Sequence, residues 1–280
     1  MSCERFCLTF EFTSNLYASF RITKHEHSYQ RMTSVWLLPV ITLIVASSVG
    51  GELAQALHSH SVTCALATIA FTIFILSIGL ALALMILTIY FTRLVLHGYP
   101  QGLSIVSSFV PLGPCGQAGF SVLIIGRFMK ESLPVSGSTS PFLGSAQTGE
   151  VVFVVCVCIS FILWALATMW LVYALLGIQN IMRRTRISFE LAFWSMIFPN
   201  VSVVGNILFT CPGDCNYSQG VYAINTIALY QVLDVGFFRV WGAIYSVFTI
   251  LLWGFFFYRT IASVPHGKIF AAPCLKELER

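Results

Sequence analysis

Long runs of apolar residues, each about as long as a membrane-spanning helix, dominate the pattern of hydrophobic and polar positions in this chain. A helix that crosses the hydrocarbon core of a bilayer needs about 20 mostly apolar residues. Six stretches meet this requirement, over residues 35–57, 65–90, 103–126, 151–178, 191–208 and 240–258. The pattern predicts an all-α polytopic membrane protein with about six transmembrane helices arranged in hairpins.

The composition supports this fold class and excludes several others. Hydrophobic residues make up 57% of the 280 residues and charged residues 9%, with a mean hydropathy of +0.84. Soluble domains carry about 25% charged residues, so a soluble domain, a nucleic-acid-binding protein and a disordered chain are all excluded. We expect residues 1–30 to form a cytosolic segment, 31–262 the transmembrane domain in the lipid bilayer, and 263–280 a cytosolic tail.

The distribution of basic residues predicts the orientation of the chain. Six crossings place 12 of the 15 Lys and Arg residues on the side that both termini share. The opposite side carries Arg127, Lys130 and Arg239. Because cytoplasmic loops are enriched in Lys and Arg, we expect both termini to be cytosolic.

Proline-bearing stretches alternate with stretches that lack proline. Pro39 lies in the first stretch, Pro111 and Pro114 in the third, and Pro199 in the fifth. Proline removes a helix hydrogen bond, and a bilayer tolerates such broken backbone only inside protein or along a cavity. The pattern therefore predicts that these three stretches line a pathway while the others face lipid. The alternative is that proline and glycine mark only kinks and close helix packing.

The polar residues of these stretches favour an anion as the transported species. Central parts of the stretches carry no Asp or Glu, which disfavours cation channels and proton-coupled carriers. Backbone N–H groups, helix dipoles and hydroxyls can hold an anion. The six histidines lie outside the apolar runs without metal-ligand or catalytic-triad spacing, so we expect neither an enzyme nor a metal or cofactor. Asn216 begins a candidate glycosylation sequon.

Several motifs carry a resemblance to a known family. They are RMTSVWLLPVITLIVASSVGG (31–51), SFVPLGPCGQAGF (108–120), WSMIFPN (194–200), FFRVWGAIYSV (237–247) and IFAAPCLKEL (269–278). From about residue 25 to the C-terminus, the chain resembles the fungal sulfite efflux pump and malic acid transport protein group of the tellurite-resistance/dicarboxylate transporter family. Plant slow-type anion channels are relatives of this family.

The resemblance implies a fold of ten transmembrane helices in five hairpins, with the odd-numbered helices around a central pore. The six stretches would be the last three hairpins, so four helices are missing from the N-terminal side. The resemblance also implies a homotrimer in the plasma membrane that exports sulfite, or alternatively transports malate. A third alternative is a truncated remnant that transports nothing.

Candidate pathway residues follow from the broken helices and the resemblance, in which Phe198 matches a pore-occluding phenylalanine. The candidates for pore shape and gating are Pro39, Pro111, Gly113, Pro114, Gly116, Gln117, Gly119, Phe198 and Pro199. The candidates for contact with the anion are Ser47, Ser48, Ser107 and Ser108. The alternative for Phe198 and the serines is a role in helix packing.

Residues 201–219 depart from the family pattern. Relatives continue directly from FPN into a stretch like GVYAINTIALYQVLD, which begins here only at Gly220. At three nucleotides per residue these 19 residues correspond to 57 nucleotides, and Val-Ser at the start and Gln at the end can be encoded by GTAAGT and CAG. We hypothesise a retained intron. With it present, residues 191–208 still cross the membrane and 221–233 become a short interfacial helix.

Overall fold

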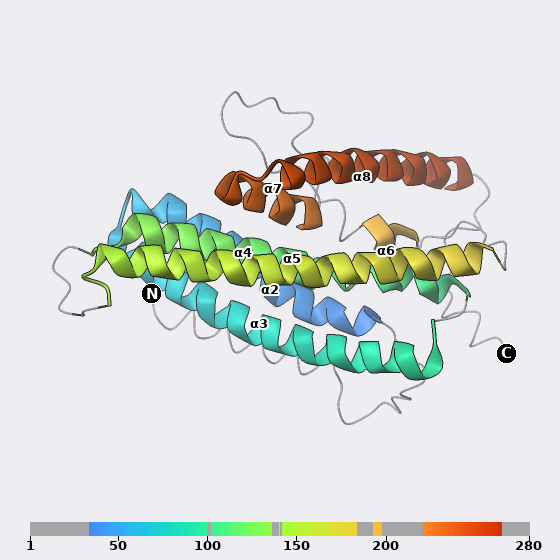
Figure 1. Cartoon of the computed structure of the whole chain (residues 1–280), viewed down its shortest axis with the longest axis horizontal. Coiled ribbons are helices and arrows are strands. Elements are labelled where there is room, and N and C mark those ends of the chain that lie inside the picture. The colour runs from blue at the N-terminus through green and yellow to red at the C-terminus, as the bar shows by residue number, and fades with distance from the viewer. Residues whose placement is uncertain are drawn as a thin grey trace.

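The computed structural model describes residues 34–99, 102–135, 140, 142–183, 193–197 and 221–264, and every regular element in these ranges is a helix. In chain order (Figure 1), the elements are the 3-10 helix η2 (Ser34–Leu37), α2 (Leu38–His58), α3 (Val62–His97), the 3-10 helix η3 (Gly102–Phe109), α4 (Leu112–Ser132), α5 (Ala146–Met182), α6 (Trp194–Ile197), α7 (Val221–Leu233) and α8 (Gly236–Ser263).

Five helices are long and apolar enough to cross a membrane. They are Leu38–His58, Val62–His97, Ile105–Ser132, Ala146–Asn180 and Gly236–Ser263. These helices confirm five of the six predicted stretches and the all-α polytopic fold class. The remaining stretch, 191–208, lies mostly outside the described residues, where only 193–197 and α6 within it are described.

The helices pack as hairpins around α4. Figure 1 shows α2 beside α3, α4 beside α5, and α7 beside α8, and α4 also contacts α2 and α7. Of the most apolar part of each span, 94% is buried around α4, against 33% for α3 and α5 and 28% for α8. This contrast confirms the predicted inner position of residues 103–126 and the outer position of the other three. For α2 the buried share is 44%, between the two groups.

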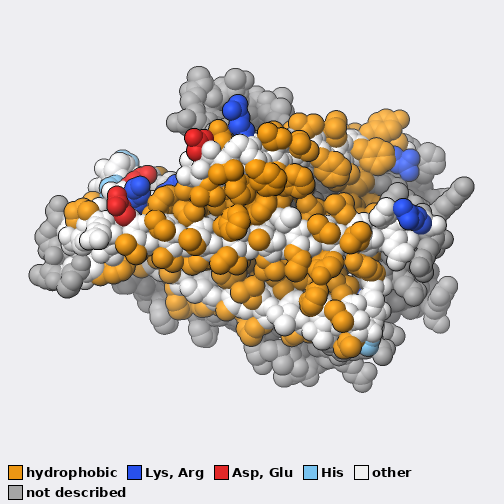
Figure 2. Space-filling view, in the orientation of Figure 1, with side chains coloured by type: hydrophobic (Ala, Val, Ile, Leu, Met, Phe, Trp, Pro, Cys, Tyr) orange, Lys and Arg blue, Asp and Glu red, His pale blue; other side chains and the backbone are white. Residues whose placement is uncertain are grey.

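The outer helices present apolar side chains on their exposed faces. Ile162 of α5 is 64% exposed and Leu251 of α8 is 68% exposed. Figure 2 shows hydrophobic side chains across the middle of one face, with charged side chains near its edges. A water-soluble protein rarely exposes so large an apolar surface, and a lipid bilayer solvates it.

Local sequence signals set the limits of α3. The Ser61 side chain accepts a hydrogen bond from the backbone N–H of Cys64 at 3.4 Å, which is the usual role of an N-cap serine. At the other end Gly98 has a φ of 71°. Glycine adopts this left-handed backbone conformation without a steric penalty, so α3 ends there.

Small residues let pairs of helices approach closely. A Cβ added to Gly126 of α4 would lie 2.7 Å from the Cβ of Cys156 on α5. A Cβ added to Gly79 of α3 would lie 3.0 Å from side-chain atoms of Leu43 and Ile44 on α2. Such contacts resemble the small-residue interfaces by which transmembrane helices associate.

We expect Gly126→Ala to destabilise the bundle, because the new methyl group forces α4 away from α5. The cost of such overpacking is about 1–3 kcal/mol, and thermal unfolding of the detergent-solubilised protein would detect it as a lower midpoint temperature. Gly254→Ala on α8 is the matched control, since its added Cβ meets no atom within 4 Å. Equal midpoints for the two variants would contradict this account of the α4–α5 contact.

Candidate functional site

The prolines of the inner span lie where a 3-10 helix passes into an α-helix. Pro111 and Pro114 lack the N–H groups that would bond to the carbonyls of Ser107 and Val110. The N–H of Val110 bonds to the Ser107 carbonyl at 2.9 Å, and the N–H of Gly113 bonds to the Val110 carbonyl at 3.0 Å. The expected break is therefore a tightened turn in which both carbonyls keep a donor.

Side chains from neighbouring helices close this turn from outside. The Ser34 hydroxyl donates to the Ser107 carbonyl, and the hydroxyls of Tyr90 and Ser108 lie 3.3 Å apart. Ser107 and Ser108 are both buried. The two predicted anion contacts thus lie at the proline turn, where α3 and η2 meet the inner span.

Pro39 does not interrupt a helix, and here the sequence-based prediction was wrong. It is the second residue of α2, which follows η2 directly. The first turn of an α-helix has no partner for its N–H groups, so a proline there costs no hydrogen bond. Pro39 therefore marks the start of α2.

Four polar residues connect α2 to α4, and we call them the polar seam. They are Ser47, Ser48, Gln117 and Ser121. The hydroxyls of Ser47 and Ser121 lie 3.1 Å apart, and the Gln117 amide donates to the Ser48 hydroxyl. The three serines are buried and Gln117 is half-buried. The structure thus brings together three of the predicted site residues, and each is engaged with the facing helix.

Helix α7 has the bounds predicted for residues 221–233, but its position differs from the predicted one. An interfacial helix would expose one side, whereas Tyr222, Asn225, Thr226 and Leu229 of α7 are all 0% exposed. The helix packs against α4, α5 and α8. It sits inside the bundle because its polar side chains find hydrogen-bond partners there.

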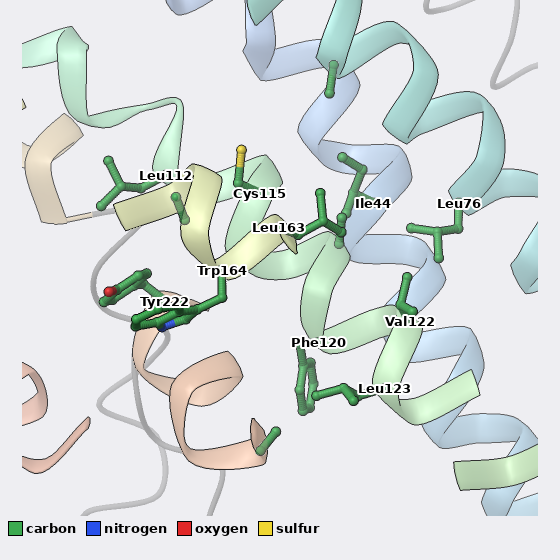
Figure 3. Packing of buried hydrophobic residues seen from close by; sticks show 14 of the residues in the cluster. Ile44, Leu76, Leu112, Cys115, Phe120, Val122, Leu123, Leu163, Trp164 and Tyr222 are labelled. Carbon is green, nitrogen blue, oxygen red and sulfur yellow. The ribbon is translucent and has the colours of Figure 1, made fainter. Parts of the chain in front are cut away.

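Part of those partners lie on one face of α5. Ser160 donates to the Asn225 side-chain oxygen at 2.8 Å, and the indole N–H of Trp164 donates to the Thr226 hydroxyl at 2.9 Å. The Trp164 ring also stacks on Tyr222 with a centroid distance of 6.2 Å (Figure 3). These bonds hold α7 at a fixed height along α5.

One turn further along α5, Thr168 continues the same row. Its hydroxyl lies 2.8 Å from the Tyr222 hydroxyl, which also accepts a hydrogen bond of 2.9 Å from the indole of Trp241 on α8. We call the row of bonds from residues 160, 164 and 168 to α7 the polar ladder. Sequence analysis interpreted residues 151–178 as a plain lipid-facing helix and missed it, although the four-residue spacing was the available signal.

Gly119 of α4 faces the polar ladder. A Cβ at this position would collide with the Asn225 amide nitrogen. That nitrogen is buried, and among the described residues it has no hydrogen-bond acceptor. The absence of a side chain at Gly119 is thus what admits Asn225. Gly113, Pro114 and Gly116 are buried on the same helix.

A single cation lies on α4 before its last turn. Arg127 is half-buried, and its Nη2 lies 3.0 Å from the Gln231 side-chain oxygen and 3.5 Å from the Ala228 carbonyl, both on α7. Phe198, Pro199 and Asn216 lie outside the described residues, so their predicted roles stay predictions. Within the described part of the chain, no group of three or more His, Cys, Asp or Glu side chains could hold a metal ion.

Comparison with known proteins identifies relatives of most of the chain. The chain is 29% identical to the sulfite efflux pumps SSU1 of Arthroderma benhamiae and Trichophyton rubrum over 259 residues, which cover 92% of this chain and 59% of each relative. It is 30% identical to the sulfite efflux pump SSU1 of Arthroderma otae over 240 residues, covering 86% of this chain and 56% of the relative. The chain thus spans less than two thirds of the length of these relatives. No solved structure matches it.

A family-level comparison covers most of the same sequence. Residues 6–209 match the family described as SLAC1, voltage-dependent anion channel. This range is well over half of the chain and includes α2 to α6. Together with the inner helix α4 and its apolar outer helices, the match shows that this chain belongs to the SLAC1 family of voltage-dependent anion channels.

Proposed function

We propose that this protein transports anions across a membrane and that its activity is sulfite efflux. The observation that carries the proposal is the chemistry of α4, the most buried span. From Leu112 to Met129 this helix has hydroxyl, amide and guanidinium groups but no carboxylate. Such groups stabilise an anion, whereas a carboxylate would repel it. The names of the relatives from Arthroderma and Trichophyton support sulfite as the anion.

The proposed pathway follows the inner face formed by α2, α4 and α7. Gly113, Gly116 and Gly119 would keep this face of α4 narrow, and the proline turn would shape it. The predicted anion contacts of the polar seam and the proline turn would supply hydroxyl donors. The proposed gate remains Phe198, followed by Pro199.

The proposed orientation places both termini in the cytosol and the protein in the plasma membrane. It rests on the 12-to-3 distribution of basic residues. With a negative cell interior, each exported negative charge gains about 2.3 kcal/mol per 100 mV. Export would then proceed without a coupling ion. A homotrimer is proposed from the family resemblance.

Two alternatives compete with sulfite efflux. The chain could transport a C4-dicarboxylate such as malate, which carries two separated charges and is larger. It could also be a remnant without transport activity, because it spans only 59% of its relatives from Arthroderma benhamiae and Trichophyton rubrum. A single transport assay separates these alternatives.

We also propose that residues 201–219 are an insertion into one span. The first support is the place of α6. Phe193, beside it, lies with its ring 5.7 Å from that of Phe256 on α8, and the indole of Trp194 donates to the Thr260 hydroxyl at 3.0 Å. Helix α6 thus borders the C-terminal part of α8.

The second support is the register of α7 against the same helix. The Tyr222 ring lies 4.7 Å from that of Tyr245, nearer the N-terminus of α8. From Phe193 to Tyr222 the chain advances 29 residues, while the two partners on α8 are 11 residues apart. Counted from Trp194, the advances are 28 and 15 residues. Two helices paired along their length advance equally, so the surplus of 13 to 18 residues supports an insertion about as long as 201–219.

If this insertion is a retained intron, spliced transcripts should join Asn200 directly to Gly220. Sequencing of full-length transcripts across this junction and upstream of Met1 is the measurement. Deletion of residues 201–219 should then raise the unfolding temperature of the expressed protein, because α6 and α7 become one continuous helix. Ribosome-associated transcripts that retain all 57 nucleotides would refute the intron.

A strain that lacks its own sulfite efflux pump should regain sulfite tolerance when it expresses a transport-competent form of this protein. We expect efflux of sulfite at least about tenfold above the vector control, with little malate uptake, because α4 offers one compact cationic group. Malate uptake without sulfite tolerance would favour the dicarboxylate alternative. Loss of both activities in correctly inserted protein would favour the remnant.

Gln117→Leu should lower the rate of sulfite efflux about fivefold, since the loss of one hydrogen-bond donor costs about 1 kcal/mol. The matched control is Gln179→Leu at an exposed position near the end of α5. Ser48→Ala breaks the same hydrogen bond from the other side but leaves the amide in place. Equal efflux by the Ser48 and Gln117 variants would mean that Gln117 acts only in packing α2 against α4.

A further inference from the structure

Arg127 is placed where a charged side chain is expensive, at the edge of the bundle interior. It is half-buried and is the one charged residue of α4 between Leu112 and Met129. Ionisable residues within membrane helices are rare and usually mark the path of an ion or a substrate. Sequence analysis used Arg127 only to assign the orientation of the chain.

The contacts of Arg127 position its guanidinium without neutralising it. Its two partners, the Gln231 side-chain oxygen at 3.0 Å and the Ala228 carbonyl at 3.5 Å, are uncharged. Among the described residues, both bonds use Nη2. A guanidinium has five N–H groups in a planar fork, so the three on Nη1 and Nε are available for a further acceptor.

The nearest charged groups differ from Arg127 in their surroundings. Lys130, three residues further along α4, lies over the Phe153 ring of α5 at 5.1 Å from its centroid. Glu131 follows one turn after Arg127 and is exposed, as is Asp234 after the end of α7. The guanidinium bonds to the neutral oxygens of α7, and Lys130 provides an equal charge directed toward a different helix.

Arg127 shares one face of α4 with residues already assigned to the proposed pathway. Gly113, Gly116, Phe120 and Arg127 follow one another at intervals of three, four and seven residues. Positions with this spacing lie on the same side of an α-helix. Gln117, by contrast, faces α2 through the polar seam. The row therefore runs from the proline turn to the guanidinium.

We infer that Arg127, held in place by Gln231, forms a binding site for a small oxyanion at the end of the pathway near the C-terminus of α4. A guanidinium presents parallel N–H groups that match two oxygens of an oxyanion such as sulfite. The inference rests on the proposed pathway for its location. In the proposed orientation this end is exoplasmic, so the site is the last that an exported anion meets.

The first test measures binding without transport. The detergent-purified chain is titrated with sodium sulfite, and with sodium chloride at equal ionic strength, while its unfolding temperature is recorded. We expect a sulfite-specific increase that Arg127→Gln weakens at least about tenfold in apparent Kd, since a charge-assisted hydrogen bond contributes about 1.5–3 kcal/mol. Lys130→Gln should keep the wild-type shift, and Arg127→Lys should keep part of it.

Gln231→Leu provides a second variant if Arg127→Gln fails to fold. It leaves the charge and removes the anchor, so sulfite should still bind, but more weakly than to the wild-type chain. If Arg127 only fastens α4 to α7, both variants lower the unfolding temperature equally in sulfite and chloride and leave the sulfite-specific shift intact. That result, or a wild-type chain without any sulfite-specific shift, overturns the inference.

A flux measurement separates this site from the proposed function. In vesicles at low ionic strength, Arg127→Gln should reduce sulfite flux about tenfold, because focused charge raises the local anion concentration. The difference should shrink near 1 M salt, where the Debye length is about 3 Å. An Arg127-dependent binding shift without any wild-type flux would refute sulfite efflux and leave the site standing. Unchanged flux and binding in Arg127→Gln would refute the site alone.

Discussion

Inside a bilayer every backbone polar group must find its partner within the protein, and the centre of this bundle is arranged around that constraint. Pro111 and Pro114 each deprive one carbonyl of its usual donor. The backbone answers with two shorter-range bonds, and Ser34 adds a third donor from a neighbouring element. An unsatisfied carbonyl in hydrocarbon costs several kcal/mol, so α4 depends on contact with η2 at this turn. The helix must therefore be central, which agrees with its 94% burial.

The same requirement explains how α7 fits into the bundle although it is only 13 residues long. A helix of this length crosses less than the hydrocarbon core of a bilayer and carries an asparagine, a threonine and a tyrosine at fully buried positions. The polar ladder on α5 and the indole of Trp241 on α8 take up these groups. Gly119 supplies the space for the amide of Asn225. Polar groups and a missing side chain thus act together at one interface.

The sequence was sufficient to predict the spans, because run length and hydropathy depend on each segment alone. Residues 38–58, 62–97 and 236–263 form helices close to the predicted ones for this reason. The partners of individual side chains could not be predicted, because they depend on which helix faces which. Ser160, Trp164 and Thr168 stand in an apolar run whose average conceals them. Pro39 was misplaced because the start of α2 is set by η2, which hydropathy does not register. Of the predicted site, Ser47, Ser48 and Gln117 do meet, and the phenylalanine assigned to the gate lies outside the described residues.

The polar ladder also separates the position of α7 from the chain that leads into it. Each of its hydrogen bonds joins residues from 222 onward to α5 or α8, and none involves α6. Helix α7 is therefore anchored by α5, which lies beside it, and by α8, the next helix along the chain. The length of the connection before it can change without moving its partners. An evolving or mis-spliced gene can alter this junction and still yield a protein in which the last hairpin is correctly docked, so proper assembly of that hairpin is no measure of an intact conduction route.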